Sequence, residues 1–159
     1  MATNWAFYDD GILAIGDGTD LSSTTAGRYK LALMQGPSGG SPYTPDPLNH
    51  RYWDEVSASE IAAVDNGYTL GGVSLTGVVL SEVTGDVKWT VDSPITFTQA
   101  GANSLGPTQY AIIRDTVNDG GQNGTLICWT QFSSEADLTN GTSFSLIIPT
   151  TGILTIQRA

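Results

Sequence analysis

The segment SPYTPDPLNHRYWDEV, residues 41–56, holds the single histidine of the chain, His50, with two carboxylates close behind it, Asp54 and Glu55. A histidine oriented by a carboxylate is the arrangement that activates a nucleophile in many hydrolases. On a helix, the four-residue spacing would place Asp54 on the same face as His50, which is equally the geometry of a local surface hydrogen bond. We interpret His50 as a structural residue and predict no catalytic residue.

Three groups of carboxylates could supply the acid and base of a glycoside hydrolase. They are Asp9 with Asp10, Asp17 with Asp20, and Asp54 with Glu55. All lie in settings typical of turns or helix starts, where aspartate is common for conformational reasons. The sequence does not give the separation between the carboxyl groups, and we therefore favour structural roles for all three groups.

Metal and cofactor chemistry has little support in the sequence. One histidine and one cysteine cannot form the usual nitrogen and sulfur site for zinc. The stretches GDGTD (16–20) and NDGGQNG (118–124) resemble pieces of calcium loops but lack the spacing of an EF-hand. GPSGG (36–40) has no lysine of a phosphate-binding loop and is interpreted as a flexible turn. Cys128 lies in the apolar run TLICWTQF and is predicted to be a buried, inert thiol. We predict no metal and no cofactor.

The charge of the chain limits its partners. Sixteen acidic and six basic residues give the 159-residue chain a formal charge of −10. Binding to nucleic acid or to an anionic membrane needs clustered basic residues. Here the basic residues are scattered: Arg28, Lys30, Arg51, Lys88, Arg114 and Arg158. We therefore expect neither nucleic acid nor a membrane as a partner, and the N-terminus lacks the pattern of a secretory signal.

Alternation of apolar and polar residues dominates the chain and predicts strands. In DVKWTVD, for example, Val87, Trp89 and Val91 would face a core while Lys88 and Thr90 face solvent. The same reasoning gives eight candidate strands, at residues 28–34, 73–83, 86–92, 94–99, 109–116, 125–132, 143–149 and 152–158. Glycine-rich turns separate them. The predicted fold is all-β, a single antiparallel β-sandwich or jelly roll of about eight strands.

Two parts of the chain depart from this pattern. Residues 47–63 are predicted to contain a short helical segment, with Asp46 as its cap, Pro47 at its first position, and Leu48, Tyr52 and Val56 along one stripe. Residues 1–28 form either an N-terminal arm that orders against a neighbouring molecule or a first strand followed by a loop. Residues 29–159 then form the sandwich domain.

Aromatic residues crowd into the first half of the chain, mostly outside the clean strand patterns. Such residues can anchor a protein–protein interface, stack on sugar rings, or fold back beneath a long loop. The interface reading is slightly favoured, and the candidate interface residues are Trp5, Phe7, Tyr8, Tyr43, Tyr52 and Trp53.

The order of motifs resembles that of a group of small virion proteins of tailed bacteriophages. The resemblance runs from about Tyr29 to Ile156, and its most specific feature is the coupling of YTPD (43–46) to GYTLGG (67–72). The remaining motifs are YKLALM (29–34), VKWTVDSPITFT (87–98), QYAIIRDT (109–116), TLICWTQF (125–132) and GTSFSLIIPTTGILTI (141–156). The chain departs from the pattern at Ser93–Pro94, and its first 28 residues have no counterpart.

This resemblance implies a structural protein of the virion without catalytic activity. Our leading expectation is a capsid decoration, or cement, protein on the head surface, made in the host cytoplasm during assembly. Its partners would then be the major capsid protein and neighbouring copies of itself, with a homotrimer suggested by the symmetry of head lattices. The alternative is a tail- or fibre-associated sandwich that binds host glycan or another tail protein.

Overall fold

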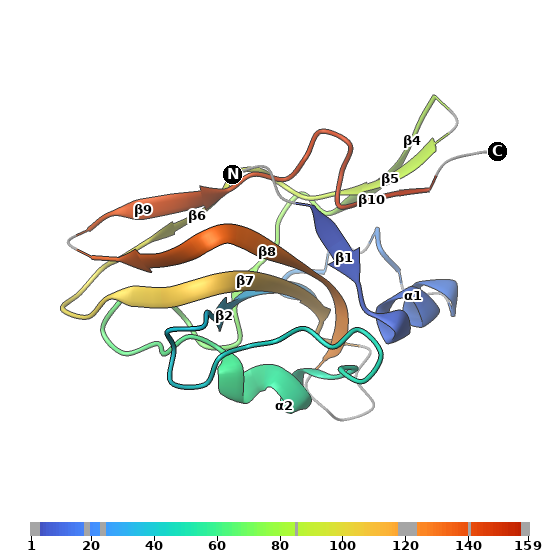
Figure 1. Ribbon diagram of the computed structural model, residues 1–159. Coiled ribbons are helices and arrows are strands. Elements are labelled where there is room, and N and C mark those ends of the chain that lie inside the picture. The colour runs from blue at the N-terminus through green and yellow to red at the C-terminus, as the bar shows by residue number, and fades with distance from the viewer. Residues whose placement is uncertain are drawn as a thin grey trace.

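The computed structural model describes residues 4–17, 20–22, 25–84, 86–117, 124–139 and 141–156. Within these residues the fold is built from antiparallel sheets with two short helices and one 3₁₀ turn (Figure 1). The strands are β1 (Trp5–Phe7), β2 (Tyr29–Gln35), β3 (Val73–Ser74), β4 (Val79–Val83), β5 (Asp86–Thr90), β6 (Ile95–Thr98), β7 (Leu105–Asp115), β8 (Thr125–Leu138), β9 (Ser143–Leu146) and β10 (Leu154–Ile156). The all-β, sandwich-like prediction is confirmed.

The largest sheet has the strand order β1-β8-β7-β2-β3, and both of its faces are covered. In β2, Leu31 and Leu33 point into the main core, whereas Ala32 and Met34 point into a second, smaller apolar cluster on the opposite face. A strand buried on both faces cannot alternate apolar with polar residues. This explains why YKLALMQ is a nearly continuous apolar run.

Two small sheets cover the face of the large sheet that carries Leu31 and Leu33. One has the order β10-β5-β4 and the other pairs β6 with β9. Trp89 of β5, Phe97 of β6 and Leu146 of β9 enter the main core. In Figure 1, β6 and β9 lie above the large sheet, while β4, β5 and β10 extend away from it at the upper right.

The predicted helical segment at residues 47–63 is mostly not helical. The Asp46 carboxylate accepts the backbone N–H groups of Leu48 and Asn49 and forms a turn instead of capping a helix. The helix α2 occupies only Trp53–Val56, and the 3₁₀ turn η1 covers Ser57–Ser59. Helix cannot start earlier because the backbone around Arg51 is used for pairing with β8: the N–H of Leu126 donates to the carbonyl of Arg51. Leu48, expected on an inward stripe, is exposed.

Part of the described portion of residues 1–28 belongs to the large sheet. Strand β1 pairs with β8, with Trp5 opposite Thr130 and Phe7 opposite Cys128. The helix α1, Asp9–Gly16, follows it and was not expected from the sequence. It packs on β8 through Gly11, where an added Cβ would lie only 2.4 Å from the carbonyl oxygen of Ile127.

Glycines fix the connections that the sequence indicated as turns. Residues 73–83, predicted as one strand, are divided into β3 and β4 by a turn at Gly77. This residue has a φ of +58°, and an added Cβ would collide with the carboxylate of Asp92. Strands β4 and β5 form an antiparallel pair, with Val83 opposite Asp86.

Candidate functional site

Three of the six candidate interface aromatics are interior residues. Tyr8, Tyr43 and Trp53 belong to the smaller apolar cluster between the large sheet and residues 43–56. The hydroxyls of Tyr8 and Tyr43 are hydrogen bonded to each other, and burial raises the pKa of both phenols, that of Tyr43 to about 12. The guanidinium of Arg114 lies 4.4 Å from the centre of the Trp53 ring. These three side chains pack the fold and present little surface to a partner.

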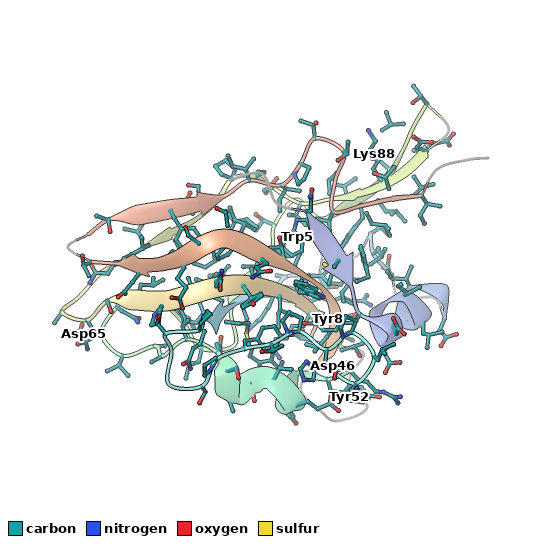
Figure 2. All side chains as sticks on the ribbon, in the orientation of Figure 1. Trp5, Tyr8, Asp46, Tyr52, Asp65 and Lys88 are labelled. Atoms are coloured by element: carbon teal, nitrogen blue, oxygen red, sulfur yellow. The ribbon has the colours of Figure 1, made fainter. Side chains whose placement is uncertain are left out.

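The other three candidates are half-buried. Trp5 and Phe7 pack against the main core from β1. Tyr52 forms an isolated β-bridge with Thr125. In Figure 2, Tyr8 lies among interior side chains, whereas Tyr52 lies at the lower edge of the molecule. An interface role for Trp5, Phe7 and Tyr52 remains a prediction.

His50 serves the loop that contains it. Its Nδ1 atom accepts a hydrogen bond from the backbone N–H of Asp46 at 3.2 Å, and its ring stacks on Tyr43 with a centroid separation of 5.9 Å. The Glu55 carboxylate, in turn, accepts the backbone N–H groups of Arg51 and Tyr52 and so caps α2. These contacts fit the interpretation of His50 as a structural residue.

The carboxylate pairs that the sequence offered as catalytic acids and bases make structural contacts. In each carboxylate pair at least one member is bound by a neighbour: Asp10 by Arg51 at 3.0 Å, Asp20 by the Ser22 hydroxyl at 2.6 Å, and Glu55 as described above. Most of NDGGQNG and part of GDGTD lie outside the described residues. Among the described residues, no group of three or more potential metal-ligating side chains comes together.

The turn at residues 36–40 places a serine between glycines. Gly36, Ser38 and Gly40 formally fit the G-x-S-x-G spacing of a serine nucleophile elbow, which requires a strand before it and a helix after it. Here the segment follows β2, but it is an exposed turn without a following helix. The Ser38 hydroxyl donates to the Glu135 carboxylate at 2.7 Å, and this pair ties the turn to β8.

A buried polar network that the sequence analysis missed joins β2, β7 and the loop after η1. The Glu60 carboxylate accepts hydrogen bonds from the Tyr68 hydroxyl at 2.7 Å and from the Gly71 N–H at 2.8 Å. Arg114 donates to the Gly71 carbonyl at 3.0 Å, and the backbone N–H of Leu33 donates to the Tyr68 hydroxyl. Burial raises the pKa of Glu60, and the hydrogen bonds oppose this shift.

A second buried pair lies beside this network. Asp115, fully buried, accepts hydrogen bonds from two nitrogen atoms of Arg28: Nε lies 3.1 Å from each carboxylate oxygen, and Nη2 lies 2.8 Å from Oδ2. One feature of the sequence could have indicated buried ion pairs here. Arg114 and Asp115 follow directly on the apolar strand QYAII, and charged groups in such a strand need buried partners. The sequence could not name those partners, which lie 87 positions away in the case of Arg28.

Two exposed surfaces remain after these contacts are assigned. The first, which we call the α1 groove, is a hollow of about 570 Å³ between α1 and the residues leading into α2. Its lining residues are Asp10, Leu13, Ala14, Asp17, Arg51, Tyr52 and Thr125. Ile12 and Leu13 of α1 are 56% and 61% exposed. Apolar side chains this exposed on a short helix contribute little to the core and are available to a partner.

The second surface is the outer part of the sheet β10-β5-β4, which we call the projecting sheet; Lys88 marks it in Figure 2. Registered pairing puts Leu80, Trp89 and Leu154 side by side on one face, followed by Glu82, Val87 and Ile156. Trp89 is buried in the core, whereas Leu80 and Ile156 are exposed. The apolar face therefore continues from the core into solvent.

Comparison with known proteins adds no relative. No protein-family model, curated protein or solved structure matches the chain. Among the described residues, no helix is long and apolar enough to cross a membrane.

Proposed function

We propose that the protein is a structural protein of a tailed-bacteriophage virion, a decoration protein that binds the assembled head and stabilises it through protein–protein contacts. The observation that carries this proposal is the exposure of Leu13, which lines the α1 groove, and of its neighbour Ile12 on the same helix. The order of sequence motifs from Tyr29 to Ile156 supports the assignment to virion proteins.

The α1 groove has the make-up of a docking surface. Leu13, Ala14 and Tyr52 supply apolar area, and Asp10, Asp17 and Arg51 supply charged groups around it. Burying apolar area against a partner contributes about 25 cal/mol per Å². Charged groups at the edge of such an area set orientation and association rate more than affinity.

The position of α1 is fixed firmly enough for this role. Strand β1 pairs with β8 immediately before the helix, and the backbone N–H of Asp9 donates to the carbonyl of Pro47. Gly11 brings the helix into direct contact with the backbone of Ile127. A rigidly held helix loses little conformational entropy when it binds.

Decoration follows from binding an assembled surface in preference to dispersed subunits. A protein that binds only the closed shell shifts the equilibrium towards the shell by mass action. Each contact can be modest, because many copies act on one lattice. This function requires surfaces and no reacting group.

The test uses phage heads that lack the protein, to which purified protein is added before heating. The α1 variant carries Ile12→Ser and Leu13→Ser, and the matched control carries Val64→Ser and Leu70→Ser, which also remove two large apolar side chains at similarly exposed positions. We expect wild type and control to bind the heads and raise their disruption temperature, and the α1 variant to do neither. Equal protection by the α1 variant would exclude α1 as the docking site, and wild-type protein found on tails instead of heads would refute the decoration role.

A further inference from the structure

Strand β4 forms one edge of the projecting sheet. It pairs with β5 on one side, and among the described residues no other strand pairs with it. An edge strand carries a row of outward backbone N–H and C=O groups that can pair with another chain. In Figure 1, β4 lies on the outer margin of the molecule at the upper right.

The side chains of β4 do not protect this edge. Natural edges are usually blocked by lysine, proline, a bulge or a covering element. Val79, Leu80 and Val83 are instead 47%, 40% and 41% exposed, and Glu82 is the one charged residue of the strand. The exposed residues lie on both faces, since Leu80 and Glu82 alternate with Val79, Ser81 and Val83. An apolar edge exposed on both faces is suited to strand addition.

The sequence of β4 indicates which strand is added. VLSEV agrees with its own reverse at three of its five positions: valines stand at both ends and Ser81 stands at the centre, whereas Leu80 and Glu82 exchange places. We propose that β4 pairs in antiparallel fashion with β4 of a second copy, about a two-fold axis through Ser81. Val79 then faces Val83 of the other copy at both ends, and the two projecting sheets join into one continuous sheet.

The number of paired residues and the charge of Glu82 together select this register, since an axis at Leu80 would pair only three residues of β4. Residues that lie opposite each other in paired strands point to the same side of the sheet. A two-fold axis between the strands must therefore pass through a residue position and not between two residues. With the axis at Ser81, all five residues pair and Glu82 faces the aliphatic Leu80 of the other copy. With the axis at Glu82, two carboxylates face each other directly and only three residues of β4 pair. Like charges directly opposite across strands are destabilising.

The contact is small, and its strength depends on conditions. Each chain carries a formal charge of −10, so copies repel each other at low ionic strength and pair more readily when salt screens the charges. A five-residue edge covers less area than a standard interface. Association is therefore weak in dilute solution and becomes significant at high local concentration. The inference concerns a surface separate from the α1 groove and holds whatever that groove binds.

Disulfide cross-linking tests the pairing and its register together. The axis brings the two Ser81 Cα atoms to about 4.5–5.5 Å, within reach of a disulfide. The variant Ser81→Cys should form a covalent dimer under mild oxidation at least about ten-fold faster than Thr155→Cys on the opposite edge of the sheet. Cys128 is buried and does not compete. A mixture of Val79→Cys and Val83→Cys proteins should cross-link, whereas either protein alone should not.

A second measurement avoids reliance on cysteine variants. Sedimentation of wild type at high protein and salt concentration should show dimers that are lost in the variant with Leu80→Lys and Val83→Lys, with unchanged circular dichroism. Equal cross-linking rates for Ser81→Cys and Thr155→Cys, or wild type that remains monomeric, would overturn the inference. Cross-linking of Ser81→Cys only to a different protein on intact heads would show that the edge binds another partner, and would also overturn it. None of these three results would affect head binding through α1, which is measured separately.

Discussion

Glu60 and Arg114 both bind the backbone of Gly71: the Glu60 carboxylate accepts a hydrogen bond from its N–H, and the Arg114 guanidinium donates one to its carbonyl. Gly71 has a φ of +85°, which suits glycine and disfavours other residues. Glu60 comes from the end of η1 and Arg114 from β7, so this link fastens the loop of residues 60–72 to the large sheet.

We predict a measurable pH dependence of stability from Glu60. Because burial raises its pKa in the folded state, the folded protein binds more protons than the unfolded protein above the ordinary glutamate pKa, about 4.3. The Glu60 contribution is therefore fully present below that pH and is lost as pH rises through the folded-state pKa. The free energy of unfolding, measured in urea at several pH values, should fall with pH more steeply in wild type than in Glu60→Gln, by at most about 1.4 kcal/mol per pH unit.

The control for this prediction is Glu82→Gln, which removes an exposed carboxylate from β4. A difference between the pH profiles of the two glutamine variants then reports on the burial of Glu60. If Glu60→Gln and wild type have parallel profiles, the Glu60 carboxylate is not perturbed by burial.

The Arg28–Asp115 pair should be costly to break. Arg28→Ala leaves the Asp115 carboxylate buried without its cation, and loss of one partner of a buried pair typically costs about 3–5 kcal/mol. Arg51→Ala, which breaks the more exposed pair with Asp10, should cost about 0–1 kcal/mol. Both values come from urea unfolding at neutral pH, and similar losses for the two variants would contradict the difference in burial.

The two glycines of α1 should respond in opposite ways to alanine. Gly11→Ala places a Cβ 2.4 Å from the Ile127 carbonyl oxygen, and the helix must move away from β8. We expect a loss of about 1–3 kcal/mol, as for other overpacked sites. At Gly16 an added Cβ meets nothing within 4 Å, so Gly16→Ala should be neutral or stabilise the protein by up to about 1 kcal/mol. Thermal unfolding followed by circular dichroism distinguishes these outcomes.

Cys128 should be unreactive until the protein unfolds. The thiol is fully buried in β8, and burial raises its pKa well above the ordinary value, so little thiolate forms. A thiol reagent such as Ellman's reagent should label the native protein far more slowly than protein in concentrated urea. Rapid labelling under native conditions would mean that β8 opens locally.

The sequence determined the strands because alternation and turn chemistry are local. All eight predicted strand regions contain β-structure, and the inward positions of Trp89 and Val91 were predicted correctly. The expected buried state of Cys128 is also confirmed. Every second residue of a pleated strand points to the same face, so the residue types along the strand predict which face is buried.

The tertiary structure decided the features that depend on distant partners. The helix expected from Pro47 gave way because the backbone near Arg51 pairs with β8, and α1 forms although two of its eight residues are glycine, since β8 provides a surface that fits Gly11. The same holds for Tyr8, Tyr43 and Trp53, which an exposed loop would offer to a partner but which the fold encloses. Their burial, and the pairing of Arg28 with Asp115, follow from contacts between segments far apart in the chain. A local pattern of residues cannot predict such contacts.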